Sequence, residues 1–141
     1  MGNIILNYVN RVDVFTDKDS KELVASKTKY NEYEMVNTKI TGKSQGALYI
    51  NRSSLEDIDI TQTSTALQVS DSNISGYAQF YVDTAKNLTF TDVTGLNIHF
   101  VLKHTKLVYY NTDNNNSNTK CYVKFEGASY GLDTNINPEV E

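Results

Sequence analysis

Apolar and polar residues alternate in short stretches along the whole chain, the pattern of β-strands, because successive residues of a strand face opposite sides. Turn-forming residues such as Asp, Asn, Ser and Gly separate the stretches. Helical periodicity is scarce, so the chain is predicted to be all-β. The predicted strands are residues 4–8, 12–15, 22–26, 33–40, 47–51, 57–61, 66–69, 77–82, 88–91, 96–103, 106–110 and 120–125.

Two of these strands indicate which side chains form the core. In residues 76–83 and 96–103, every second residue is apolar and shares one face of its strand. We expect these apolar side chains to point inward and the two strands to lie in the middle of the fold. The inward residues are Ala78, Phe80, Val82, Ile98, Phe100 and Leu102.

The last third of the chain predicts a β-hairpin. Residues 107–110 and 121–125 alternate as strands, and residues 112–119 between them carry no apolar side chain. Asn and Asp favour turns because they tolerate left-handed backbone and hydrogen-bond to their own main chain. We therefore expect an antiparallel pair with a long polar tip.

Many short strands, frequent turns and a single proline favour a single-domain antiparallel β-sandwich or jelly-roll. The length of 141 residues fits one domain. We assign residues 1–126 to this β-sandwich domain. The alternation stops after Phe125, so residues 127–141 are predicted to form an extended C-terminal arm.

Charge and composition narrow the classes of partner. The net charge is −4, and Lys and Arg are scattered among acidic residues, so we expect no nucleic acid partner. No apolar stretch is long enough to span a bilayer, and no membrane partner is expected. Residues 1–6 lack the basic lead and the apolar run of a secretion signal, which predicts a protein made in a cytoplasm.

Residues able to bind metals or act as nucleophiles are few. Cys121 is the only cysteine, and its place in the alternation predicts a buried side chain rather than a disulfide. His99 and His104 would fall on opposite faces of one strand, which disfavours joint ligation of a metal. The acidic turns at residues 17–22 and 57–61 lack the central glycine of a calcium loop. With no sequence motif of a known nucleophile or phosphate loop, we expect no catalytic residue, metal or cofactor.

Ten tyrosines and no tryptophan offer two uses for aromatic surface. Tyrosine rings flanked by amides can stack on sugars, and tyrosine is also common at protein interfaces, where the ring is buried with its hydroxyl near water. The absence of tryptophan favours an interface. A carbohydrate-binding β-sandwich module stays the alternative, and a small hydrolase using an acid pair such as Asp83 and Asp92 is a third possibility.

In its Asn-, Thr-, Ser- and Tyr-rich strands, its polar turns and its lack of a catalytic motif, the chain resembles the small all-β structural proteins of tailed bacteriophages. This resemblance lies in overall texture. It implies a non-enzymatic virion subunit, assembled in the host cytoplasm, that decorates the capsid or builds the neck, tail or fibre attachment. Its partners would be copies of itself and other structural proteins of the particle, joined through edge strands and terminal arms.

The predicted contact residues are the tyrosines beside the hairpin, the hairpin tip and the apolar residues of the arm. Each group has an alternative role: the tyrosines could line the core, the tip could be a solvated turn, and the arm could cover an edge of its own sheet. The residues are Tyr109, Tyr110, Tyr122, Asn114, Asn115, Asn116, Asn118, Tyr130, Leu132, Ile136 and Val140.

Overall fold

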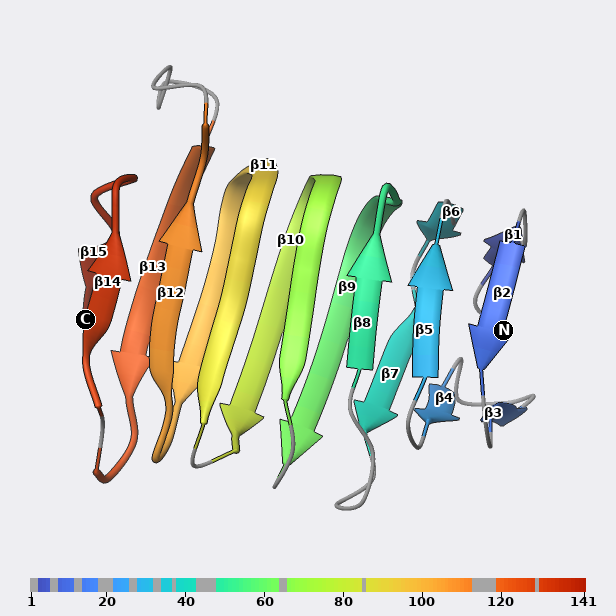
Figure 1. Cartoon of the computed structure of the whole chain (residues 1–141), viewed down its shortest axis with the longest axis horizontal. Helices are drawn as coiled ribbons and strands as arrows, with labels where there is room; N and C mark the ends of the chain where they lie inside the picture. Colours follow the sequence, from blue (N-terminus) through green and yellow to red (C-terminus); the bar gives the residue numbers. More distant parts are fainter. Residues whose placement is uncertain are drawn as a thin grey trace.

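The computed structural model shows an all-β chain wound into a β-solenoid of about four turns (Figure 1). Its strands lie in two layers, with β1–β3 near one end of the stack and β14 and β15 at the other. Side chains are described for residues 35–36, 38–40, 48–63, 66–84, 86–112, 119–128 and 130–141. For the strands before residue 48, the structure otherwise describes the course of the backbone.

The strands before residue 48 are short. They are β1 (Asn3–Ile5), β2 (Tyr8–Arg11), β3 (Val14–Asp17), β4 (Glu22–Ala25), β5 (Thr28–Asn31), β6 (Glu34–Val36) and β7 (Lys39–Gly42). Longer strands, several of which bend around a corner of the solenoid, follow. They are β8 (Leu48–Asn51), β9 (Ser54–Thr63), β10 (Leu67–Asp83), β11 (Asn87–Leu102), β12 (Lys106–Tyr110), β13 (Thr119–Phe125), β14 (Leu132–Thr134) and β15 (Glu139–Val140).

Residues at equivalent positions of successive turns stack directly on one another. One column consists of Leu48, Leu67, Leu88 and Leu107, paired in parallel between β8, β10, β11 and β12. Members of this column are 19, 21 and 19 residues apart in the sequence. On the opposite layer the equivalent column consists of Ile60, Phe80, Phe100 and Val123. The chain is therefore a repeat of about one turn per 20 residues.

The parallel stack shows that the predicted antiparallel sandwich or jelly-roll is wrong. The predicted hairpin is wrong too, because β12 pairs with β11 and β14, whereas β13 pairs with β11 and β15, all in parallel. Alternation in the sequence reports which side chains face inward. It does not report the direction of the neighbouring strand, and a parallel solenoid and an antiparallel sandwich share the same alternation.

Antiparallel pairing is confined to the first strands. Strands β1, β2 and β3 run antiparallel to β6, β5 and β4 respectively. Strands β4, β5 and β6 then pair in parallel with β7, β8 and β9. The first three strands therefore cover the first edge of the parallel stack, where backbone N–H and C=O groups would otherwise be open to pairing.

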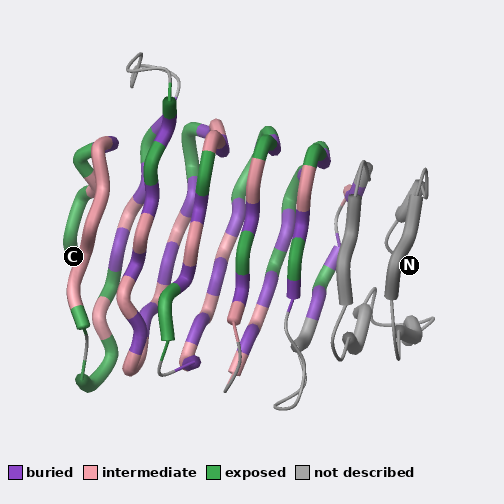
Figure 2. The backbone as a smooth tube through the Cα atoms, in the orientation of Figure 1, coloured by how far each residue is buried: buried purple, intermediate pink, exposed green. Residues whose placement is uncertain are grey.

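A single apolar core runs along the described part of the solenoid between the two layers, and buried residues alternate with exposed or half-buried ones along β8–β13 (Figure 2). Its centre is a cluster of aromatic rings from three successive turns. Phe90 lies 5.0 Å, centroid to centroid, from both Phe80 and Phe100, and 5.1 Å from Tyr109. The six predicted inward residues of β10 and β11 are all buried, as is Cys121, which confirms these predictions.

Side chains buried at one corner hold successive turns together. Arg52, Asp71 and Asp92 occupy this corner in consecutive turns with φ of 50°, 49° and 55°, the left-handed conformation that turns the chain sharply. Just inside it, the Ser53 N–H donates to Ser72 Oγ at 3.1 Å. Buried polar groups thus bond one turn to the next where the sheet bends.

Asn111 makes the densest set of bonds at this corner. Its Oδ1 accepts from the Val93 N–H at 3.1 Å, while its Nδ2 donates to Val93 O at 3.2 Å and to Thr119 Oγ1 at 3.3 Å. Asn135 continues the contact into the last turn: its Oδ1 accepts from the Asn111 N–H at 3.0 Å, and its Nδ2 donates to Asn111 O at 2.8 Å. Three turns are therefore joined through two asparagines.

The segment predicted as an arm contributes to this last turn. Strand β14 pairs with β12, and β15 pairs with β13. Ile136 between them is buried in the core, and Leu132 packs against it. Residues 132–140 thus add strands to the end of the parallel stack.

Candidate functional site

Three outward surfaces of the solenoid carry side chains that could bind a partner. The first is an aromatic ladder, formed by Tyr77, His99 and Tyr122 from successive turns. The His99 ring lies between the other two, 4.6 Å from each, at interplanar angles of 27° and 13°. Because both faces of His99 are covered, a sugar cannot stack on this ring.

Polar neighbours fix the ladder in place. The Tyr77 hydroxyl donates to Gln79 Oε1 at 3.3 Å, and His99 Nε2 lies 2.6 Å from Asn97 Oδ1. Lys120 Nζ lies 5.6 Å from the centroid of the Tyr122 ring, within cation–π range. These contacts therefore hold the three rings of the ladder in position.

The second surface is the corner groove, a hollow of about 430 Å³ lined by Asn73, Ile74, Ser75, Gly76, Thr94, Gly95 and Leu96. It lies where the register between β10 and β11 shifts, between Ile74 and Ala78. A Cβ on Gly95 would lie 2.7 Å from Ile74 O, so the two strands approach closely here because position 95 has no side chain. Leu96, the residue after this glycine, is 63% exposed.

The third surface, the uncharged face, covers four adjacent parallel strands. Apart from Lys106 at the start of β12, the outward side chains along β8, the first part of β10, the first part of β11 and β12 are uncharged. In strand order they are Tyr49, Asn51, Gln68, Ser70, Thr89, Thr91, Val108 and Tyr110. At one end of this face a hollow of about 360 Å³, the face groove, is lined by Tyr49, Ile50, Asn51, Gln68 and Ser70.

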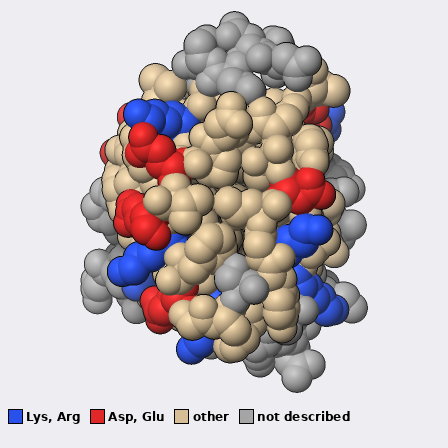
Figure 3. All heavy atoms as spheres, turned by 90° about the vertical axis from the view of Figure 1, so that its left-hand side faces the viewer, with Lys and Arg blue, Asp and Glu red and all other residues tan. Residues whose placement is uncertain are grey.

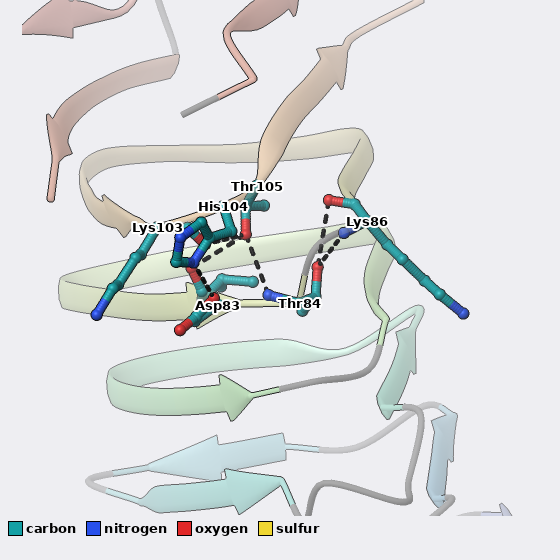
Figure 4. Close-up of polar contacts among 7 residues, drawn as sticks. Asp83, Thr84, Lys86, Lys103, His104 and Thr105 are labelled. Atoms are coloured by element: carbon teal, nitrogen blue, oxygen red, sulfur yellow. Dashed lines mark hydrogen bonds and ion pairs between the residues drawn. The ribbon is translucent and has the colours of Figure 1, made fainter. Parts of the chain in front are cut away.

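At the bend between β11 and β12, a histidine pairs with the acidic residue that ends β10, and Figure 4 shows the contacts there. His104 Nδ1 lies 3.1 Å from Asp83 Oδ1. Beside them, Thr105 Oγ1 donates to main-chain carbonyls and accepts from the Thr84 N–H at 3.2 Å. The Thr84 hydroxyl is bonded to the main chain of Lys86. Both threonine side chains are buried, and their hydroxyls are engaged in holding the bend.

Among the predicted contact residues, the tyrosines lie in different environments. Tyr109 is buried in the core, and its hydroxyl donates to Val93 O at 2.7 Å. Tyr110 is on the uncharged face and donates to the Asp133 carboxylate, a bond that raises the pKa of the phenol. Tyr122 belongs to the aromatic ladder, so the structure does not bring these three rings into one patch.

The remaining predicted contacts also separate. Asn114, Asn115, Asn116 and Asn118 lie outside the described residues. Tyr130 and Val140 are exposed, whereas Ile136 is buried and Leu132 is half-buried against the core.

Sequence reasoning missed the aromatic ladder, the corner groove and the uncharged face. All three depend on residues from successive turns being neighbours, so the signal was the repeat of about 20 residues. A leucine begins the apolar pattern of each of four turns, at positions 48, 67, 88 and 107. Aligning the sequence on those leucines is enough to place Tyr49 beside Gln68.

Charges of both signs are mixed on the end face of the solenoid (Figure 3). Basic and acidic side chains are interspersed on the face at the end formed by β14 and β15 (Figure 3). Asp92 has its pKa lowered because the hydroxyl and then the N–H of Thr112, from the next turn, donate to its carboxylate. No group of three or more His, Cys, Asp or Glu side chains within the described part of the chain could hold a metal ion.

Comparison with known proteins gives no relative for this chain: no family model, curated protein or solved structure matches it. The described residues contain no helix long and apolar enough to cross a membrane. The geometry of the three surfaces is therefore the basis for assigning a role.

Proposed function

We propose that this protein is a non-enzymatic structural subunit of a larger protein assembly. The solenoid supplies a stiff body, and the corner groove with its exposed apolar neighbours supplies the contact surface. The observation that carries the proposal is the exposure of Leu96 (63%) and Tyr77 (47%) at the same corner of adjacent turns.

These side chains suit a protein interface. Burying a leucine or aromatic side chain that was exposed contributes about 1.5–3 kcal/mol. Asn73, Ser75 and Thr94 around the groove provide the uncharged polar rim that surrounds the apolar centre of many interfaces. Asn73 Nδ2 already donates to Thr94 Oγ1 at 2.7 Å, so part of this rim is ordered before a partner binds.

The partners of this proposal are other copies of the chain and further structural proteins of the same particle. A parallel stack in which each turn is hydrogen-bonded to the next holds its surface residues at fixed spacing, which limits the entropy lost on assembly. The resemblance to structural proteins of tailed bacteriophages makes a virion the first particle to examine.

The test is the state of assembly of the full chain with Leu96→Asp. Analytical ultracentrifugation, and co-purification with proteins from the same source, should show that the wild type assembles. Leu96→Asp should assemble at least about tenfold more weakly, because it places a charge in the apolar centre of the interface. Asn87→Asp is the matched control, since it places the same charge at an exposed position at the start of β11, outside the corner groove. The proposal fails if Leu96→Asp sediments and co-purifies as the wild type does.

A further inference from the structure

The uncharged face differs from the rest of the surface in its chemistry. Two columns of outward side chains cross its four strands. The first column contains Tyr49, Gln68, Thr89 and Val108, and the second contains Asn51, Ser70, Thr91 and Tyr110. In register, the first column continues to Lys29 on one side and to Asp133 on the other, so the uncharged area has a charged residue at each border.

The face groove at one end of these columns combines an aromatic ring with amide and hydroxyl groups. Tyr49 is 40% exposed, and Gln68 occupies the next position in its column. Ser70 Oγ donates to Asn51 Oδ1 at 2.8 Å, which orders the polar side of the groove. The volume of about 360 Å³ is near the lower end of the range for small-molecule sites.

Tyr49 and Gln68 keep their binding groups open. The Tyr49 ring stacks on no other described ring, in contrast to Tyr77 and Tyr122 in the aromatic ladder. Within the described residues, neither the Tyr49 hydroxyl nor the Gln68 carboxamide makes a hydrogen bond. A flat ring face beside a carboxamide, which both donates and accepts, matches the two surfaces of a sugar: its C–H face and its hydroxyl edge.

From this arrangement we infer that the uncharged face binds a neutral glycan chain, with Tyr49 and Gln68 forming its main sugar subsite. The lining carries no charge that would pair with sulfate, carboxylate or phosphate. Neighbouring strands are about 4.8 Å apart, a spacing comparable with the length of one sugar unit in an extended chain. A glycan seated on Tyr49 can therefore follow the columns across Thr89 and Thr91 toward Tyr110.

The experiment uses the full chain and defined probes. A glycan array carrying neutral and anionic oligosaccharides, followed by affinity electrophoresis in gels with barley β-glucan, xylan or dextran, measures binding and its specificity. We expect the protein to bind at least one neutral glycan. We expect no binding that depends on an anionic group of the glycan. Tyr49→Ala and Gln68→Ala should each weaken it about tenfold or more, whereas Tyr49→Phe should retain it because the ring remains.

Two controls separate this site from general effects on the fold and from assembly. Tyr81→Ala removes a half-buried tyrosine from the opposite layer and should leave glycan binding unchanged. Leu96→Asp should also leave it unchanged, since the corner groove is a separate surface. Circular dichroism of each variant checks that the β-sheet content is kept.

Two results would overturn the inference. One is the absence of binding to every neutral glycan on the array. The other is binding that Tyr49→Ala and Gln68→Ala leave intact. If these two variants instead change the sedimentation of the protein, the uncharged face is an interface between copies of the chain, and the glycan assignment is wrong.

Discussion

Asn111 provides the sharpest test of how the turns are held together. Its side chain is buried and makes hydrogen bonds with the N–H and O of Val93 and with Thr119 Oγ1. Asn111→Ala removes all of them. The carbonyl of Val93 keeps the Tyr109 hydroxyl as a donor, but the buried Val93 N–H loses its bond to Asn111 Oδ1.

The expected cost follows from these partners. A buried donor left without an acceptor costs about 1–3 kcal/mol, and each neutral hydrogen bond that is lost adds about 0.5–1.5 kcal/mol. We expect Asn111→Ala to lower the free energy of unfolding by about 2–4 kcal/mol. For a chain of 141 residues this corresponds to a fall in Tm of roughly 10 °C.

Urea unfolding followed by circular dichroism measures the change, with a thermal scan as a second reading. Asn97→Ala is the matched control, because Asn97 is exposed and its side chain bonds to the His99 ring on the surface of the aromatic ladder. This control should stay within about 0.5 kcal/mol of the wild type. If Asn111→Ala is no less stable than Asn97→Ala, the buried corner bonds do not hold the turns together.

Two further changes probe the core and the corner groove. Burial raises the pKa of the Cys121 thiol to about 12, from an ordinary value near 9, so the folded state favours the neutral thiol. This stabilisation is complete below pH 9 and is lost as the pH rises toward 12. The free energy of unfolding should therefore fall more steeply between pH 9 and 11 in the wild type than in Cys121→Ala. Equal slopes of this free energy against pH would contradict the prediction. Gly95→Ala would place a Cβ 2.7 Å from Ile74 O, so it should lower the free energy of unfolding in urea by about 1–3 kcal/mol. Ser75→Ala, on the same groove, should be nearly neutral. Similar values for both variants would count against a close approach of the two strands at Gly95.

Local features of the fold could be predicted from the sequence. Alternation identified the inward residues of β10 and β11, and it placed Cys121 in the core, because side-chain direction depends on the strand alone. It also located β8, β9, β12 and β13 to within a few residues, but it divided β10 and β11 into two strands each and did not predict β14 and β15.

Strand partners could not be obtained in the same way. The polar stretch of residues 112–119 resembled a hairpin tip, yet β12 and β13 do not pair with each other. The partners of a strand are the strands in the turns on either side of it. The sequence indicates these partners only through the spacing of equivalent residues such as Leu67 and Leu88. The candidate surfaces depend on the same spacing, so they became visible only with the stack.

The repeated corner of Arg52, Asp71 and Asp92 has a consequence for how such a chain can change in length. Because every turn begins and bends at equivalent residues, duplication or loss of one whole unit of about 20 residues preserves the contacts of the units on either side. An insertion of one residue within a strand would shift the inward side chains out of their columns, whereas the bends accommodate differences of a few residues between turns. The protein can therefore be lengthened or shortened by whole turns while the packing of its core is kept.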